Sequence, residues 1–355
     1  MRLLITGACG FVAAELAEAL LGRIEGLSIT GIDNLMRPGA AVNVDRLRRL
    51  GVRFVHGDIR MASDMASLPA ADWVIDAAAN PSVLAGVDGK SSSRQLFEHN
   101  LASIANVLEY CRTHSAGLFL LSSSRVYNIP ALCGLPLRER ENAYVLDESA
   151  ALPHGITADG IGPEFSTAVP VSLYGATKLS CEVMALEYGA TFDFPVWVTR
   201  CGVLAGAGQF GTPAQGIFAY WINAHLRRRP MRYVGFNGQG LQARDALHPR
   251  DLAALLAAQM GCQRRAGQRV YTAGGGVTRC RSLAQLTEWC DGRFGAHRVE
   301  SDPRPRPFDI PWVAMSNADA TRDFGWRPEV SMDDLLEGIA HHAAQHPEWL
   351  ELSGV

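Results

Sequence analysis

The chain has 355 residues, a length that suits about two domains of ordinary size. Its apolar fraction of 48% and charged fraction of 19% are typical of a packed globular protein and exclude global disorder. A formal net charge of −3 provides no general field for nucleic acid or for an anionic membrane. No apolar run reaches the ~18 residues of a membrane span, and the N-terminal segment has no cleavage context. We therefore expect a cytoplasmic protein with no nucleic-acid or membrane partner.

The cysteines and histidines follow no disulfide or metal-binding pattern. None of the eight cysteines shares a C-x-x-C spacing with another, and the histidines contain no H-E-x-x-H. His342 and His346 have helical i, i+4 spacing, but they lie in an Ala-rich stretch that favours a solvated helix face. We expect reduced thiols and no metal site.

The first third of the chain alternates between short apolar strands and helices. The predicted strands are Arg2–Thr6, Ser28–Ile32, Val52–His56, Trp73–Ala77 and Gly117–Ser122, and the predicted helices are Phe11–Leu21 and Gln95–Arg112. Strands separated by helices imply a parallel sheet that is covered on both faces. The pattern predicts an α/β fold.

Residues 128–173 differ from their surroundings. The stretch is rich in Pro, Gly and acidic residues and is longer than most loops in compact domains. It is either a flap over a site or a disordered insertion, and the segments that flank it favour the flap. From about residue 205 onward, short strands, helices and Pro-rich connectors predict a smaller second lobe. We expect a first domain over residues 1–200, with returns at about 235–275, and a second lobe mainly over 201–355.

A glycine-rich turn follows the first strand and opens a helix. Gly7 and Gly10 begin the pattern G-x-x-G-x-x-A, in which the first glycine permits a tight turn and the second lets a pyrophosphate approach the helix N-terminus. Asp33 ends the second strand, where an acid can bind both ribose hydroxyls of an adenosine and repel a 2′-phosphate. Asp58 and Ile59 follow the third strand, where they could border an adenine. Together these features predict a dinucleotide site that favours NAD over NADP, although Arg37 lies close to Asp33 in the sequence.

Two further motifs carry potential chemistry. Tyr174 and Lys178 stand at i, i+4 on one helix face, where the ammonium and a nicotinamide cation would both favour the phenolate. The serines at 122–124 follow the fifth strand, at the sheet edge where such folds place their sites. Alone, the first motif could be an ordinary surface helix turn, and the second could be an ordinary loop.

These motifs together resemble the extended short-chain dehydrogenase/reductases of the NAD-dependent nucleotide-sugar epimerase/dehydratase family. The likeness runs over essentially the whole chain. It includes TGACGF at 6–11 in the glycine turn, DNL at 33–35, GDI at 57–59, AAA at 77–79, SSSRVY, YGATK, GAGQF at 206–210, RDALH at 244–248 and FGW at 324–326. It implies a Rossmann doubly wound parallel sheet that holds NAD, with a smaller C-terminal α/β lobe that binds a nucleotide-sugar substrate. It also leads us to expect a homodimer.

The resemblance assigns roles to individual residues. Tyr174 resembles the family's base, Lys178 its partner on the cofactor ribose, and Ser123 the hydroxyl that contacts the reacting sugar. The expected cofactor contacts are Gly7, Gly10, Phe11, Val12, Asp33, Asn34, Asp58, Ile59, Ala77, Ala78, Ala79, Asn100, Tyr174 and Lys178. The expected substrate contacts are Ser124, Arg200, Gln209, Arg244 and Arg306, with Arg244 and Arg306 on the diphosphate.

Departures from the family pattern reduce the number of reactions that we expect of this chain. Dehydratases of the family carry Asp-Glu after the catalytic Thr, whereas this chain has Ser124 and Arg125, so that elimination and decarboxylation are disfavoured. The stretches at 33–47 and 208–216, and the insertion before Tyr174, resemble most the subgroup that epimerises C2 of a CDP-sugar, although Cys201 stands where that subgroup has His. We expect such an epimerase, which oxidises the sugar to a keto-sugar and reduces it on the other face. The alternatives are a UDP-sugar 4-epimerase, a nucleotide-sugar dehydrogenase or reductase, and a redox-silent NAD-binding regulator.

Overall fold

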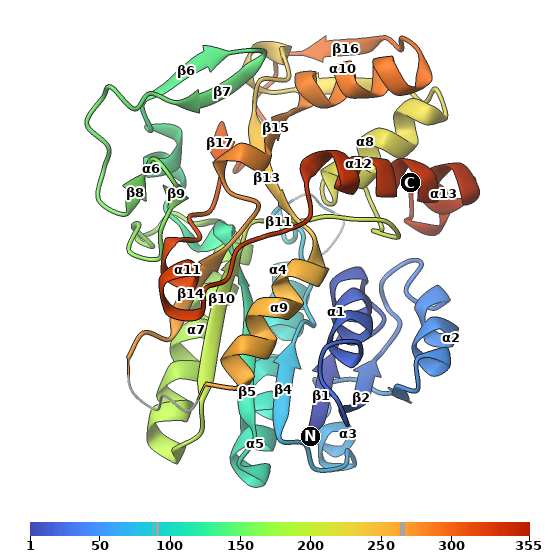
Figure 1. Ribbon diagram of the computed structural model, residues 1–355, viewed down its shortest axis with the longest axis vertical. Coiled ribbons are helices and arrows are strands. Elements are labelled where there is room, and N and C mark those ends of the chain that lie inside the picture. Colours follow the sequence, from blue (N-terminus) through green and yellow to red (C-terminus); the bar gives the residue numbers. More distant parts are fainter. Residues whose placement is uncertain (88, 90–91, 263–266) are drawn as a thin grey trace.

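The computed structural model describes residues 1–87, 89, 92–262 and 267–355, so that parts of the expected ranges 1–200 and 235–275 lie outside the described residues. Within them, seven parallel strands form the main sheet in the order β14-β10-β5-β4-β1-β2-β3 (Figure 1). The strands are β1 Arg2–Thr6, β2 Ser28–Asp33, β3 Arg53–His56, β4 Trp73–Asp76, β5 Gly117–Ser123, β10 Val196–Cys201 and β14 Val270–Ala273. The expected doubly wound Rossmann sheet is confirmed.

Successive side chains of the strands point to opposite faces of the sheet and pack into two hydrophobic cores. Leu3 and Ile5 of β1 pack with α1 (Phe11–Leu21), α2 (Val42–Arg49) and α9 (Pro249–Met260). Leu4 points to the opposite face and packs with α3 (Ala62–Ala66), α5 (Ser103–His114) and α7 (Ser172–Phe192). Because both faces are covered, the central strands β1, β4, β5 and β10 are mostly apolar, as parallel strands in such sheets usually are.

The chain reverses its strand order beside β1, which pairs with β2 on one side and with β4 on the other. Thr6, the last residue of β1, lies in register with Ile32 of β2 and Asp76 of β4. A crevice opens at the carboxyl ends of strands at such a switch point, and this is where ligands bind in open α/β sheets.

The C-terminal half of the chain builds a smaller lobe in the upper half of Figure 1. Its central sheet joins β11 (Val203–Leu204), β13 (Ala243–Leu247), β15 (Cys280–Ser282) and β17 (Trp312–Val313), and β12 (Met231–Val234) pairs with β16 (Val299–Asp302). The lobe's helices are α8 (Ile217–Leu226), α10 (Leu283–Phe294), α12 (Met332–Gln345) and α13 (Trp349–Leu352), and α11 (Ala318–Phe324) packs on the main sheet instead. Besides α11, the later segments α9 and β14 also return to the main sheet.

Residues 128–173 are folded against the second lobe. They form α6 (Ile129–Cys133), the hairpin of β6 (Leu137–Arg140) and β7 (Ala143–Leu146), and the hairpin of β8 (Ile156–Thr157) and β9 (Gly160–Ile161). The Ile161 N–H donates to the Ala314 carbonyl at 2.8 Å, and Ile156 and Ile161 share a core with Trp312. These residues therefore form a packed subdomain, because their apolar side chains are buried against residues 310–315, and their role as a flap near the site stays a prediction.

The predicted helix at Gln95–Arg112 is divided. The structure has α4 (Ser93–Phe97), a π-helical turn at Glu98–Ala102 and then α5. The wider turn contains Asn100, whose amide donates to the Asn80 carbonyl at 3.0 Å and accepts from the Asn80 N–H at 2.7 Å. Single π turns of this kind are frequent at functional sites.

The two lobes meet through aromatic residues near α1. Phe11 packs with Phe210 and Trp349 in one cluster, and the Phe210 and Trp349 rings are stacked at 5.2 Å. Arg37 donates to the Phe210 carbonyl at 2.9 Å and lies over the Phe210 ring. The segment after β2 is thus held by the second lobe.

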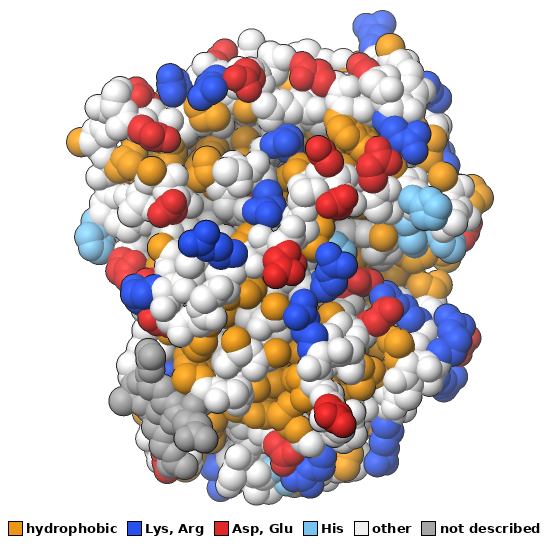
Figure 2. Space-filling model, in the orientation of Figure 1, with side chains coloured by type: hydrophobic (Ala, Val, Ile, Leu, Met, Phe, Trp, Pro, Cys, Tyr) orange, Lys and Arg blue, Asp and Glu red, His pale blue; other side chains and the backbone are white. Residues whose placement is uncertain are grey.

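The surface and the cysteines agree with the composition. Acidic and basic side chains are interspersed over the face drawn in Figure 2. All eight cysteines are unpaired. Among the described residues, no helix is both long enough and apolar enough to cross a bilayer.

Candidate active site

A cavity of about 820 Å³ runs from the glycine turn to the second lobe. It collects nearly all of the residues that the sequence predicted for the site. The predicted residues in its lining are Gly7, Gly10, Phe11, Val12, Asp33, Asn34, Asp58, Ile59, Ala77, Ala78, Ala79, Ser123, Ser124, Tyr174, Lys178, Gln209, Arg244 and Arg306. None of residues 128–173 is in this lining.

The turn after β1 fits a pyrophosphate. Gly7 has a φ of +63°, and a β-carbon there would lie 2.8 Å from the Ala78 Cα, so that a side chain has no room. No side chain caps α1 at Gly10. The first N–H groups of the helix, at Phe11 and Val12, lack intrahelical partners and can bind an anion.

Asp33 ties the end of β2 to this turn. One carboxylate oxygen accepts the Cys9 N–H at 2.9 Å, and the other accepts the Leu35 N–H at 2.7 Å. Burial raises the pKa of Asp33, while these two N–H groups act in the opposite direction. The carboxylate is therefore fixed in place at the cavity wall, with lone pairs left for ribose hydroxyls. Arg37 lines the same cavity, but its guanidinium is engaged by Phe210.

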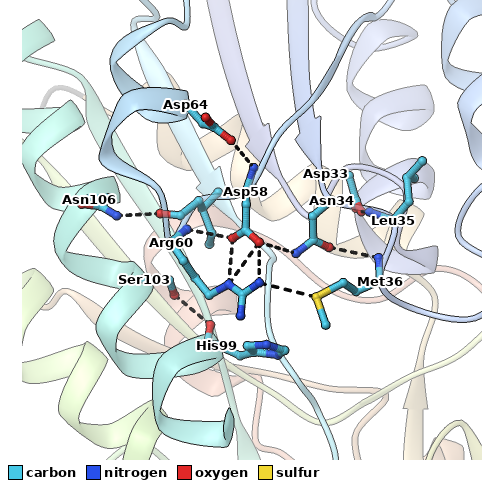
Figure 3. A network of polar contacts seen from close by, with 11 residues as sticks. Asp33, Asn34, Leu35, Met36, Asp58, Arg60, Asp64, His99, Ser103 and Asn106 are labelled. Atoms are coloured by element: carbon cyan, nitrogen blue, oxygen red, sulfur yellow. Dashed lines mark hydrogen bonds and ion pairs between the residues drawn. The ribbon is translucent and has the colours of Figure 1, made fainter.

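Figure 3 shows a polar network beside the cavity at the end of β3. Arg60 donates to Asp58 through Nη2 at 2.6 Å and through Nε at 2.9 Å, and Asn34 adds a third donor at 3.0 Å. These donors, Arg60 first, hold the pKa of Asp58 well below its usual range. From α5, Asn106 donates to the Ile59 carbonyl at 2.8 Å. The network fixes an ionised carboxylate where the sequence places the adenine.

Tyr174 and Lys178 come from the first turns of α7, and both are buried, at 6% and 5% exposure. Burial lowers the pKa of Lys178, but the charges of Tyr174 and Asp76 more than offset it, so that the pKa is raised. Asp76 is fixed by the Thr6 hydroxyl, which donates to it at 2.5 Å. The ammonium is therefore charged beside the phenol, as a base of this type requires.

The serines come from the end of β5. Ser123 ends the strand, and its hydroxyl accepts the Arg125 N–H at 3.2 Å. A 3₁₀ turn at Ser124–Val126 follows and places Arg125 in the cavity wall. Ser123, Tyr174 and Lys178 thus line one cavity together with the glycine turn.

Two predicted contacts lie elsewhere. Arg200, expected to bind substrate, is outside the cavity lining and forms a buried ion pair with Glu182 at 2.7 Å. Its guanidinium also donates to the Pro163 carbonyl at 2.8 Å, and the expected substrate contact of Arg200 stays a prediction that this arrangement does not favour. Asn100, expected to contact the cofactor, is also outside the lining, because its amide binds the Asn80 backbone.

Arginine side chains of the second lobe lie at the far end of the cavity. Arg244 donates to Asp309 at 2.9 Å and to the Ile310 carbonyl at 2.6 Å. Arg306 donates to the Ala214 carbonyl at 3.4 Å, and Gln209 donates to the Leu204 carbonyl at 2.7 Å. Such a group of arginines can bind a diphosphate.

The sequence reasoning missed several residues of the site. Arg125, Gln242, Arg281 and Asp309 all line the cavity. Arg125 directly follows the predicted serines, so its place in the motif could have identified it as a residue of the site. From the sequence alone, it indicated only that the acid of the dehydratases is absent. Thr6 and Asp76 are the last residues of the adjacent strands β1 and β4. Their matching places at the strand ends could have predicted the hydrogen bond between them. Among the described residues, no group of three or more His, Cys, Asp or Glu side chains is arranged to hold a metal ion.

Known proteins resemble the chain over most of its length. A protein-family model described as the NAD dependent epimerase/dehydratase family matches residues 3–274. The CDP-paratose 2-epimerase of Salmonella typhi is 28% identical and aligns over 95% of this chain and 97% of its own length. A dTDP-glucose 4,6-dehydratase of Streptomyces antibioticus is 30% identical, over 96% of this chain and 90% of its own.

Solved structures share the fold. The UDP-glucuronic acid 4-epimerase of Bacillus cereus, solved with UDP-glucuronic acid and NAD, has a TM-score of 0.75 at 22% identity and covers 97% of this chain and 99% of that one. The UDP-glucose 4-epimerase of Thermus thermophilus, solved with NAD, has a TM-score of 0.76 at 24% identity with the same coverage.

Proposed function

Since this chain belongs to the NAD dependent epimerase/dehydratase family of extended short-chain dehydrogenase/reductases, and its cofactor is therefore NAD, we propose that it epimerises a nucleotide-activated sugar. We further propose that the reaction takes place at C2 of a CDP-sugar. The CDP-paratose 2-epimerase of Salmonella typhi, which aligns over 95% of this chain, supports this choice.

The proposed roles are based on which residues line the cavity. Tyr174 accepts the proton of the sugar hydroxyl and later returns it, and Lys178 favours the phenolate through its charge. Ser123 shares a hydrogen bond with the same sugar oxygen. Gly7, Gly10 and the N-terminus of α1 hold the pyrophosphate of NAD, and Asp33 holds its adenosine ribose. When bound, NAD supplies the acceptor and donor for the hydride of the sugar carbon.

One observation carries the choice of an epimerase over a dehydratase. Among the described residues, the carboxylates in the cavity lining are Asp33, Asp58 and Asp309. Asp33 and Asp58 lie at the dinucleotide end, and Asp309 is paired with Arg244 at 2.9 Å. Elimination needs an acid to protonate the leaving hydroxyl, and Ser124 and Arg125 occupy the positions beside Ser123 where the dehydratases carry theirs. The wall beside Tyr174 therefore favours a reaction in which one proton and one hydride are removed and returned.

The test is to incubate the protein with a CDP-6-deoxyhexose and, separately, with a UDP-hexose in deuterated water, and to read the products by NMR. We expect inversion at C2 with no deuterium incorporated from solvent, because the hydrogen removed from C2 is returned to C2. Inversion at C4 instead would make the protein a 4-epimerase that uses the same residues. A 4-keto product with deuterium at C5 would overturn the proposal. Accumulation of a keto-sugar with one equivalent of reduced cofactor would indicate a net dehydrogenase.

We propose, in addition, that the protein works as a homodimer in the cytoplasm. Val183, Met184 and Phe192 of α7 are 55%, 43% and 46% exposed, which supports a covered helix face. The free thiols of all eight cysteines support a reducing compartment. Light scattering of the pure protein measures the oligomeric state, and a monomeric mass would contradict the dimer.

A further inference from the structure

Glu182 is a buried carboxylate on the helix that carries Tyr174. In α7, Tyr174, Lys178 and Glu182 follow one another at four-residue spacing, so that they lie along one buried side of the helix. Glu182 is 2% exposed and lies outside the cavity lining. The proposed roles of Tyr174 and Lys178 leave this charge unused, although a buried carboxylate is costly unless its partners compensate for it.

Arg200 of β10 fixes the position of this carboxylate. It donates to Glu182 through Nη2 to Oε2 at 2.7 Å and through Nε to Oε1 at 3.2 Å, which is the two-pronged geometry of an arginine–carboxylate pair. Through Nη1 it donates to the Pro163 carbonyl at 2.8 Å, and its guanidinium lies over the Tyr127 ring. Pro163 belongs to the 128–173 subdomain. The subdomain therefore holds the arginine that holds Glu182.

Glu182 also binds a residue of the cavity lining. The Ser122 hydroxyl donates to Glu182 Oε1, and Ser122 lines the cavity. Arg200 lies in register with Ser122 on the neighbouring strand, so that the three side chains meet at the end of β5. A serine hydroxyl has one hydrogen and two lone pairs. Because Glu182 takes the hydrogen, Ser122 can offer the cavity only lone pairs.

Ser123, the next residue, is bonded in the opposite sense. Its hydroxyl accepts the Arg125 N–H at 3.2 Å, so that its own hydrogen is left for another partner. Ser123 lines the same cavity as Tyr174. Of the two neighbouring serines, Ser123 can therefore donate to a sugar oxygen, whereas Ser122 cannot.

We propose that Glu182 is a positioning residue of the reaction. By binding Ser122, it ties the end of β5 to α7, so that Ser123 and Tyr174 meet the same sugar oxygen, and it leaves Ser123 as the serine that donates. Arg200 acts through Glu182 by keeping the carboxylate in place. This inference rests on the proposed function, since it concerns the atoms that contact a nucleotide-sugar.

The test separates kcat from KM in variants of the anchor. The NAD-loaded protein is assayed with a CDP-6-deoxyhexose and, separately, with a UDP-hexose, and rates are expressed per bound NAD so that a loss of folded protein does not count as a loss of rate. Ser122→Ala removes the anchor and leaves the ion pair of Glu182 with Arg200 intact. We expect kcat to fall about tenfold to a hundredfold, the range that a hydrogen bond to a charged group covers, with KM changed by less than about twofold. Ser122→Thr keeps the hydroxyl and should recover most of the rate.

Glu182→Gln tests the sense of the hydrogen bond. Arginine can only donate, so the amide must turn its oxygen to Arg200 and its N–H to Ser122. The Ser122 hydrogen is then released toward the cavity, where it competes with Ser123. We expect kcat to fall by a similar factor. Ser122→Ala/Glu182→Gln should be no slower than the slower single variant, because the two side chains act as one unit.

Thr199→Val is the matched control. Thr199 precedes Arg200 on the same buried strand, and among the described residues its hydroxyl has no hydrogen-bond partner. This change removes a buried hydroxyl beside the anchor without touching it, so kcat should keep its wild-type value.

Each other outcome overturns the inference. If Ser122→Ala lowers the urea midpoint but not kcat, the contact with Glu182 only stabilises the fold. A raised KM with an unchanged kcat would make Ser122 a substrate ligand, and independent losses in the double variant would separate Ser122 from Glu182. An equal loss in Thr199→Val would mean that any change in this core slows the reaction. If Glu182→Gln does not fold, the alanine and threonine variants of Ser122 decide alone. A wild-type protein that converts neither sugar would overturn the proposed function itself, whereas the outcomes above leave that function standing.

Discussion

Gly175 of α7 packs directly against the backbone of Arg125, and a β-carbon at Gly175 would lie 2.2 Å from the Arg125 carbonyl oxygen. This contact joins the helix that carries Tyr174 and Lys178 to the turn that follows Ser123. Gly175, between Tyr174 and Lys178, therefore allows the helix and the turn to approach each other this closely.

Gly175→Ala should destabilise the protein by about 1–3 kcal/mol, because the added methyl group forces the helix away from a backbone carbonyl. Activity should fall as well, because Tyr174 moves with the helix. Gly338→Ala in α12 is the matched control, since nothing lies within 4 Å of a β-carbon there. That change should raise stability by about 0.4–1 kcal/mol. Urea unfolding measures both variants, and an unaltered midpoint for Gly175→Ala would contradict the packing argument.

Tyr174→Phe should lower turnover by a factor of ~10²–10⁴ while leaving the fold and the NAD content nearly unchanged, because only the ionisable oxygen is removed. Steady-state kinetics on the substrate identified by NMR measures the loss. Tyr188→Phe on the same helix removes only a surface hydrogen bond to Glu109, so it should leave turnover unchanged. Retention of more than about a tenth of the activity by Tyr174→Phe would remove this residue from the role of base.

Asp33→Ala should weaken NAD more than NADP, since the change removes acceptors for the ribose hydroxyls and a charge that repels a 2′-phosphate. Both affinities should also fall somewhat, because Asp33 binds the Cys9 N–H of the glycine turn at 2.9 Å. Titration of the apoprotein with each cofactor gives the ratio. Asp45→Ala, on the exposed face of α2, should leave the ratio as it is. An equal loss for both cofactors would show that Asp33 does not read the 2′ position.

Asp245 should make stability fall as the pH rises. Its carboxylate is enclosed by backbone and accepts the N–H groups of Met315 and Gly276 at 3.1 and 3.3 Å. Burial raises the pKa of this group from 3.8 to about 6. The native state therefore binds the proton more tightly than the unfolded chain does, and the free energy of unfolding declines between about pH 4 and pH 6.

Asp245→Asn isolates this effect because the amide does not titrate. The stability of wild type relative to the variant should fall by ~3 kcal/mol between pH 4 and pH 8, as a shift of about two pKa units implies. Urea unfolding of both proteins across this range measures the difference. A difference that is constant with pH would mean that Asp245 keeps an ordinary pKa in the folded protein.

The sequence predicted the main sheet well because its signals are local. The strand Arg2–Thr6 and the helix Phe11–Leu21 have the bounds that were predicted, since apolar alternation and the glycine turn mark their ends. Helical periodicity also located residues 95–112, but it contains no signal for the π turn at Glu98–Ala102. In that turn Asn100 binds the Asn80 backbone, 20 residues earlier in the chain, a contact outside the reach of helical periodicity.

The same limit of local signals applies to the site. Glu182 and Arg200 lie on a helix and a strand 18 positions apart, so that no local pattern reveals the ion pair that withdraws Arg200 from the cavity. The packing of the 128–173 subdomain could not be predicted either, because its partners are residues 310–315. Composition alone gives no indication of so remote a contact. Motif residues such as Gly7 and Lys178 were predictable because their chemistry demands a fixed spacing.

The contact of Arg37 with Phe210 has a consequence for how readily the cofactor is exchanged. It joins the two lobes across the adenosine end of the cavity, and the C-terminal Trp349 stacks on the same ring. We expect a dinucleotide that lies beneath this bridge to leave more slowly than it would if the bridge were removed. An enzyme that returns every hydride to its product has no need to exchange cofactor, and the bridge would insulate each turnover from the cell's ratio of oxidised to reduced nicotinamide.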